Sequence, residues 1–227
     1  MRRRTAAGVA TAAGVVTIIA VASLVWPGLD AQETPEVDTS VWALQTGEGR
    51  RYARVNTSIR ELDTVRGISN PDQIVQTDDG AYLFSDSLSK VTRIDEAQPT
   101  DLDDVALREA TATPQGTVDV VTAQDFVVYL TDAGTVHTGL LSTGTTVELD
   151  PFAEDEEAPQ YTADAIAVDE RGMLFVYSRA DAAVLRYDIG AAVVRERTAL
   201  EVDGLSTPAI TAAGDDWAVV DTEDGDV

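Results

Sequence analysis

Short apolar runs separated by polar turns make up the chain from residue 41 onwards. The runs are rich in Val, Ile, Leu, Tyr and Phe, the intervening residues are mostly Gly, Asp, Asn and Thr, and no stretch of useful length has helical periodicity. Apolar runs of this length between turn residues predict β-strands. The pattern therefore predicts an all-β domain over residues 41–227.

The predicted strands recur in a fixed order. A mostly apolar strand leads through a tight turn into a strongly apolar strand, and a second polar turn leads to a third strand. The first turns contain Gly80, Asp125, Gly172 and Asp216, which are 45, 47 and 44 residues apart. A period near 45 residues is typical of β-propeller blades, which stack face to face because one sheet alone cannot bury both its faces. A β-sandwich is the alternative, but it does not predict four copies of one strand-turn-strand order.

The two ends of this repeat differ from its middle. Predicted strands at 41–44, 52–55 and 59–62 match the second, third and fourth strands of a blade whose innermost strand is missing. The fourth repeat contains only its first two strands. We therefore expect an incomplete propeller, belonging either to a truncated chain or to the first segment of a longer protein.

An apolar segment precedes the repeat. Arg2, Arg3 and Arg4 form a positive cluster, and no charged residue occurs between Thr5 and Leu29. The stretch Ala6–Trp26 has the roughly 20 apolar residues that cross a bilayer as a helix, and the arginines favour a cytoplasmic N-terminus. These features predict a signal anchor at 1–29, a polar linker at 30–40 and extracytoplasmic blades at 41–227, in a single-pass plasma membrane protein.

A cleaved signal peptide is the alternative to the anchor. Ala20-Val21-Ala22 matches a small-x-small cleavage site. Cleavage there would make the chain a secreted protein, so both alternatives export the repeat.

The composition excludes several functions. The net charge is -24, with 40 acidic and 16 basic side chains, and such a surface repels nucleic acids. The chain has no cysteine and one histidine, His137, which rules out thiolate sites and His-rich metal sites. The sequence contains no recognisable nucleophile motif for which His137 could act as a general base. We therefore interpret His137 as an ordinary strand residue. No catalytic constellation and no cofactor-binding motif is found.

The ordered features resemble a known class of proteins. An arginine-led apolar span ends in Trp26-Pro27-Gly28, and an acidic, cysteine-free repeat starts at Val41-Trp42. This arrangement is similar to the N-terminal, membrane-anchored β-propeller region of large actinobacterial surface proteins that carry fibronectin type III or Ig-like domains. The resemblance implies a cell-envelope protein with further β-sandwich modules after the propeller.

Acidic residues provide the weak candidates for a metal site. Asp221, Glu223, Asp224 and Asp226 surround Gly225 in a way that is similar to a calcium loop, but the alternation of oxygen ligands slips between Glu223 and Asp224. An ordinary acidic turn explains them better. Asp86, Asp132 and Asp221 follow apolar strands and could line an axial channel that holds a cation, although turn chemistry also explains them.

Two functions from different classes remain. The first is a non-catalytic surface display or protein-interaction module, whose partner is a protein or a cell-envelope component. The alternative is a calcium- or metal-dependent propeller hydrolase or lyase acting on carbohydrates or lactones, which rests on the strand-end acids and on analogy of fold.

Overall fold

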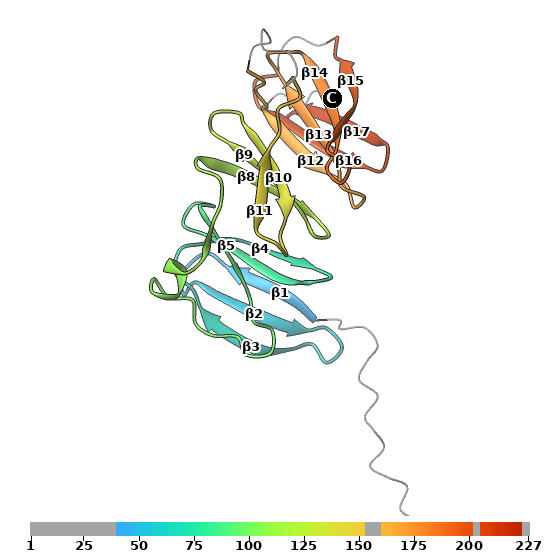
Figure 1. Ribbon diagram of the computed structural model, residues 1–227. Helices are drawn as coiled ribbons and strands as arrows, with labels where there is room; N and C mark the ends of the chain where they lie inside the picture. Colours follow the sequence, from blue (N-terminus) through green and yellow to red (C-terminus); the bar gives the residue numbers. More distant parts are fainter. Residues whose placement is uncertain (1–39, 153–159, 202–204, 224–227) are drawn as a thin grey trace, which may run out of the picture. The chain divides into compact units, whose positions relative to one another are not determined.

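The computed structural model describes residues 40–152, 160–201 and 205–223, and Ser40–Val227 form one compact unit (Figure 1). Within the described residues the regular elements are strands, except for one 3₁₀ turn at Ala106–Arg108. The chain is therefore all-β, as the sequence predicts. None of the described residues belongs to a helix that is long and apolar enough to cross a bilayer. The predicted anchor at Ala6–Trp26 lies outside the described residues and stays a prediction.

The described strands form five antiparallel sheets, each built from strands that follow one another in the chain. The first sheet contains β1 (Ser40–Gln45), β2 (Arg51–Asn56) and β3 (Glu61–Gly67); the second β4 (Pro71–Thr77), β5 (Gly80–Ser85), β6 (Lys90–Arg93) and β7 (Thr111–Ala112); the third β8 (Thr117–Ala123), β9 (Phe126–Thr131), β10 (Val136–Leu140) and β11 (Thr145–Glu148); the fourth β12 (Ala165–Val168), β13 (Met173–Ser178), β14 (Ala183–Asp188) and β15 (Val193–Ala199); and the fifth β16 (Pro208–Ala213) and β17 (Asp216–Asp221). This order confirms the predicted repeat.

The second strand of each complete sheet is buried on both faces. Five consecutive residues of β5, β9 and β13 are buried. On β13, Leu174 and Val176 pack towards the third sheet, whereas Phe175 and Tyr177 pack towards the fifth. Successive side chains of a strand point to opposite faces, so a strand between two neighbouring sheets needs apolar residues at every position. This requirement explains the continuous apolar runs in the sequence.

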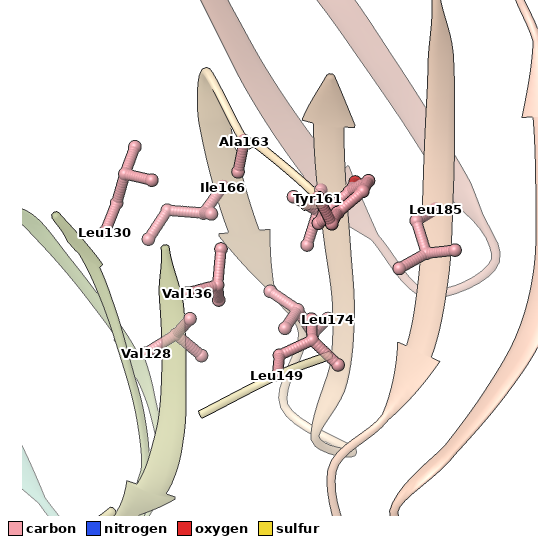
Figure 2. Close-up of a cluster of buried hydrophobic side chains, with 10 residues drawn as sticks. Val128, Leu130, Val136, Leu149, Tyr161, Ala163, Ile166, Leu174 and Leu185 are labelled. Carbon is pink, nitrogen blue, oxygen red and sulfur yellow. The ribbon is translucent and has the colours of Figure 1, made fainter. Parts of the chain in front are cut away.

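Buried side chains fill four layers, one between each pair of neighbouring sheets. Figure 2 shows the layer between the third and fourth sheets, where Val128 and Leu130 of β9 face Ile166 and Leu174. Each fully buried aliphatic side chain of this kind stabilises the fold by roughly 1.5–3 kcal/mol. The hydrophobic core is therefore a stack of thin layers and not one central cluster.

The first sheet has three described strands, and β1 takes the place of a second strand. The side chain of Gln76, near the end of β4, accepts a hydrogen bond from the Trp42 N–H (3.1 Å) and donates one to the Ser40 carbonyl (3.0 Å). The start of β1 therefore lies beside the end of β4, where β5 also starts. The described part of this sheet has three strands, at the three places where the sequence predicts them apart from the bounds of the last.

The predicted third strand of the first sheet, at 59–62, is wrong in its boundaries. The strand is β3, at Glu61–Gly67. The Asn56 side chain accepts hydrogen bonds from the N–H groups of Ser58 and Ile59, and Arg60 has a positive φ of 59°. This side-chain turn continues through Arg60 and delays the strand.

We expect Leu174→Ala to lower the free energy of unfolding by about 2–5 kcal/mol, because it opens a cavity in a closed layer. Leu174 has no exposed surface. Val147→Ala is the matched control, since Val147 is 71% exposed, and it should change stability by less than about 0.5 kcal/mol. Urea denaturation measures both values, and equal losses would contradict the layered core.

Candidate functional site

A cavity of about 1010 Å³ lies where the first strands of the sheets end. We call it the turn cavity. It is lined by residues from five strands and from the turns that follow four of them: Val41; Gln76, Thr77 and Asp78; Thr122, Ala123 and Gln124; Val168, Asp169, Glu170 and Arg171; and Ala212, Ala213 and Gly214. Each described sheet thus contributes to one shared opening, which is of the size of a ligand site.

The lining of the turn cavity is polar and mainly acidic. Asp78, Asp169 and Glu170 contribute carboxylates, and Arg171 contributes the single basic side chain of this lining. The remaining polar groups are hydroxyls and amides, such as the amide of Gln124, a residue whose φ of 52° places it at the corner of the turn between β8 and β9. The lining contains no histidine or serine, so it offers no serine–histidine pair for nucleophilic catalysis.

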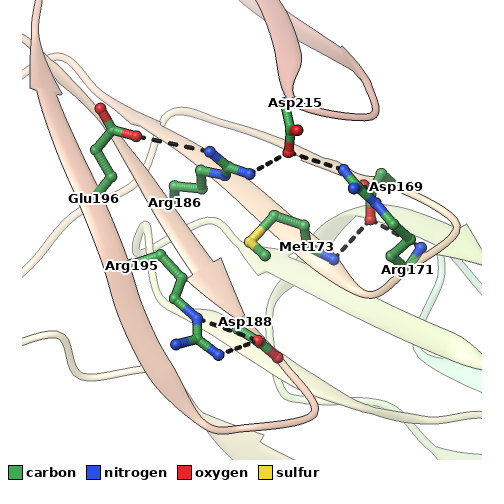
Figure 3. A network of polar contacts seen from close by, with 8 residues as sticks. All are labelled: Asp169, Arg171, Met173, Arg186, Asp188, Arg195, Glu196 and Asp215. Carbon is green, nitrogen blue, oxygen red and sulfur yellow. Dashed lines mark hydrogen bonds and ion pairs between the residues drawn. The ribbon is translucent and has the colours of Figure 1, made fainter.

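Asp169 holds the turn between β12 and β13. Its side chain is 4% exposed, and it accepts hydrogen bonds from the backbone N–H groups of Arg171 (2.9 Å) and Met173 (2.8 Å) and from Nε of Arg171 (2.9 Å) (Figure 3). All these donors belong to its own turn. A carboxylate with three such partners shapes the wall of the cavity and has little capacity left for a metal or a substrate.

Arg171 also reaches into the next sheet. Its Nη2 lies 3.1 Å from Oδ1 of Asp215, in the turn between β16 and β17, and Arg186 Nη2 binds the same oxygen (Figure 3). The guanidinium of Arg186 lies 5.7 Å from the ring centre of Phe175, which keeps it in place. We call this contact the Asp215 clamp; it fastens the fourth sheet to the fifth beside the turn cavity.

The contacts of the Asp215 clamp shift the pKa values of Asp215 and Arg171. Hydrogen bonding and charge from Arg171, together with the charge of Arg186, lower the pKa of Asp215 below its ordinary value of 3.8. The hydrogen bonds that Arg171 donates to Asp169 and Asp215 raise the pKa of Arg171. The ionic form of the pair is therefore favoured throughout the neutral range.

The strand-end acids do not meet in the turn cavity. Asp86 follows β5 in the turn at the opposite end of that strand, and it binds Asn70 (3.0 Å) and Lys90 (2.7 Å). Asp132 also follows its strand, and Asp132 and Asp221 are both outside the cavity lining. The turn cavity therefore gives no support to the alternative in which Asp86, Asp132 and Asp221 line an axial channel. Turn chemistry accounts for Asp86.

The repeat also places Asp221 at a different position from the other two acids. Asp221 is the last residue of β17, and the last residues of β5, β9 and β13 are Ser85, Thr131 and Ser178. Asp86 and Asp132 come one position later. Asp221 therefore corresponds to Ser85, Thr131 and Ser178, which are buried polar residues at the ends of β5, β9 and β13.

Asp221 closes a turn. Its carboxylate accepts hydrogen bonds from the backbone N–H groups of Glu223 (3.0 Å), Ser206 (2.6 Å) and Thr207 (3.3 Å). The N–H of Glu223, followed by those of Ser206 and Thr207, lowers its pKa. Glu223 in turn accepts a hydrogen bond from the Ser206 hydroxyl (3.1 Å).

The weak resemblance of Asp221, Glu223, Asp224 and Asp226 to a calcium loop gains no support from this geometry. Asp221 and Glu223 are engaged by hydrogen-bond donors, and Asp224 and Asp226 lie outside the described residues. Among the described residues, no group of three or more His, Cys, Asp and Glu side chains could hold a metal ion.

His137 lies away from the turn cavity. It sits in the middle sheet on β10, opposite Tyr129 of β9 and Glu148 of β11. It is a half-buried strand residue, as the sequence suggests, and it is outside the cavity lining.

Sequence reasoning missed the Asp215 clamp. The turns Glu170-Arg171-Gly172 and Gly214-Asp215-Asp216 take the same place in successive repeats. A basic and an acidic residue at corresponding positions of neighbouring blades is a usable signal for a contact between turns. Arg186, however, comes from a third strand, and its part in the clamp follows only from the fold.

Comparisons with known proteins identify a fold and no family. No protein-family model and no curated protein matches the sequence. Similar solved structures include virginiamycin B lyase from Staphylococcus aureus (TM-score 0.52, 13% identity, 83% of this chain and 61% of that one) and Hsv2p from Kluyveromyces lactis (0.58, 11%, 82% and 56%). A third is an S. cerevisiae complex of Dbp5 bound to Nup159 and Gle1 (0.54, 12%, 86% and 54%). These likenesses support the β-propeller fold, and the chain spans between 54% and 61% of the length of these proteins.

We expect Asp215→Asn to lower the melting temperature at pH 7, because the two arginines lose their anionic partner. The pKa of Asp215 is lowered in the folded chain, so its stabilising effect is complete above 3.8 and is lost as the pH falls through the folded value. The difference between wild type and variant should therefore shrink towards about pH 3.

Asp216→Asn is the control for this experiment. Asp216 adjoins Asp215 but forms no ion pair with another described residue. Its replacement should leave the melting temperature nearly unchanged at both pH values. A pH-independent loss in Asp215→Asn would show that the clamp does not act through charge.

Proposed function

We propose that this chain is a non-catalytic, membrane-anchored β-propeller segment that acts outside the cell as an interaction module. The turn cavity is its binding face. The observation that carries the proposal is the construction of this cavity, since separate sheets converge on one opening whose wall is fixed by Asp169 and the Asp215 clamp. A preformed opening of this kind suits binding, because little conformational entropy is lost when a partner docks.

The charge of the cavity defines the kind of partner. The lining contains three carboxylates and one guanidinium, and the whole chain carries a net charge of -24. A protein or envelope component with basic or hydrogen-bonding groups fits this surface, whereas a polyanion is repelled. Nup159, which has the same general fold, is bound to Dbp5 in a solved structure, and this is an analogy of fold alone.

The hydrolase or lyase alternative has no specific observation in its favour. The acids on which it rests are spread over separate turns, and two of them, Asp86 and Asp221, are engaged by hydrogen-bond donors. Virginiamycin B lyase is similar at 13% identity, a level that supports the fold and not the reaction.

We also propose that the chain is the anchored front part of a larger surface protein. The Arg2–Arg4 cluster and the apolar stretch Ala6–Trp26 support the anchor. The greater length of the similar propellers is compatible with further blades or modules.

We expect the full chain to remain in the membrane fraction after an alkaline wash, with the repeat accessible to protease on intact cells. Deletion of residues 6–26 should leave the protein in the cytosol. Release of a shorter chain into the medium, with a new N-terminus after Ala22, would establish the cleaved signal peptide and contradict the anchor.

We expect a photo-crosslinking amino acid at Gln124 to capture a binding partner on intact cells, because this residue lines the turn cavity. The matched control carries the same amino acid at Val147, which is exposed on β11 and outside the cavity. Adducts seen at Gln124 and absent at Val147, and weakened by Asp78→Lys, would support the proposal. Identical adducts at both positions would contradict a specific binding face.

A further inference from the structure

A smaller cavity lies at the opposite end of β4 and β5 from the turn cavity. Its volume is about 460 Å³, which is within the range of small-molecule sites. We call it the Arg50 pocket. The turn between β1 and β2, the start of β4 and the turn after β5 provide its lining: Thr46, Arg50, Asn70, Pro71, Asp72, Asp86 and Ser87.

A chain of hydrogen bonds holds the guanidinium of Arg50 at this pocket. Nη1 of Arg50 donates to Oδ1 of Asn70 (2.7 Å), and Nδ2 of Asn70 donates to Oδ1 of Asp86 (3.0 Å). Lys90 binds the other oxygen of Asp86 (2.7 Å). The chain runs from the first sheet into the second, so Arg50 is oriented before any ligand arrives, which lowers the entropy that binding costs.

Asn70 stands at a backbone position where the third sheet has a glycine. The N–H of Asp86 donates to the carbonyl of Asn70 (2.9 Å), and the N–H of Asp132 donates to the carbonyl of Gly116 (2.8 Å). The φ of Asn70 is 44° and that of Gly116 is 78°. Glycine adopts such angles most readily, whereas asparagine only tolerates them. The side chain of Asn70 therefore adds the bridge to Arg50 at a position whose backbone needs no side chain.

The Arg50 pocket keeps two opposite charges that are not paired with each other. Lys90 forms an ion pair with Asp86, whereas Arg50 and Asp72 form no ion pair with a described residue. Oδ2 of Asp72 accepts a hydrogen bond from the N–H of Leu88 (2.9 Å), and Oδ1 is left for another donor. In a chain with 40 acidic side chains, this small cavity thus offers one cation and one anion.

We propose that the Arg50 pocket binds a small zwitterion of the α-amino acid class. Arg50 holds its carboxylate, because a planar guanidinium presents parallel N–H donors to the two oxygens. Asp72 accepts hydrogen bonds from its ammonium group. A simple anion meets the charge of Asp72 and a simple cation meets that of Arg50, so a ligand that carries both charges is favoured. The hydroxyls of Thr46 and Ser87 add donors and acceptors to the lining.

This inference goes beyond the interaction module. The lining and the hydrogen-bond chain belong to residues 46–90, within the first two sheets. The turn cavity contains a different end of β4, so a partner can bind there whether or not the Arg50 pocket is filled.

Ligand-observed nuclear magnetic resonance titrations of the full chain in detergent test the proposal. The probes are the standard L-α-amino acids, taken one at a time. We expect at least one of them to bind. Its N-acetyl derivative lacks the ammonium and its carboxamide lacks the carboxylate, so each should bind about 10-fold more weakly or worse, because each loses a charged hydrogen-bond partner.

Variants connect this binding to the pocket. Arg50→Gln and Asp72→Asn should each weaken it by about 10-fold or more. Asn70→Gly should also weaken it, since glycine suits the backbone at this position but removes the bridge that orients Arg50. Circular dichroism of this variant should match that of the wild type. Arg60→Gln and Asp79→Asn are the matched controls, because they remove the same charges at exposed positions outside the pocket.

Three results would overturn the proposal. The first is that no amino acid binds the wild-type chain. The second is equal affinity for the amino acid and for its N-acetyl derivative or carboxamide, since one charge would then suffice. The third is an equal loss of affinity in the pocket variants and in their controls, which would assign the binding to the overall charge of the chain.

Discussion

The structure depends on the burial of both faces of the second strand in each sheet. A lone antiparallel sheet can leave one face in water, but β5, β9 and β13 are covered on both sides by neighbouring sheets. Stability is therefore shared between neighbours, because each layer needs side chains from two sheets. In repeat proteins of this kind, the energy of one unit includes its interfaces with the units beside it. The need to bury both faces of these strands explains the strongly apolar runs in the sequence.

Polar groups in the turns at the strand ends add directional contacts to the apolar layers. Apolar layers fix the distance between two sheets but tolerate sliding, whereas Asp169 and the Asp215 clamp impose directional contacts. Asp169 and Arg171 line the turn cavity, and Arg171 also binds Asp215 of the fifth sheet, so one residue both joins the two sheets and forms part of the cavity wall. The carboxylates of Asp169 and Asp215 are consequently structural, and the binding surface consists of the groups left facing the opening, such as Gln124.

Periodicity in the sequence was sufficient to predict the all-β class and the order of the strands. It was not sufficient to align the repeats to the residue. Between β12 and β13 the turn contains four residues, Asp169–Gly172, whereas two residues join β4 to β5. Such changes alter the period between repeats. Asp221 and Asp86 both follow apolar runs in the sequence, but Asp221 is the last residue of β17 and corresponds to Ser85. The clamp was also missed, because contacts between successive blades depend on which side chain each turn directs towards its neighbour.

The first sheet shows the same constraint at a position that is not covered among the described residues. Val41 occupies on β1 the position that Ala81 occupies on β5 and Leu174 on β13. Ala81 and Leu174 have no exposed surface, whereas Val41 is 50% exposed. The apolar character of this position therefore follows from the place of the strand in the repeat, because a strand that lies between two neighbouring sheets needs apolar side chains on both faces.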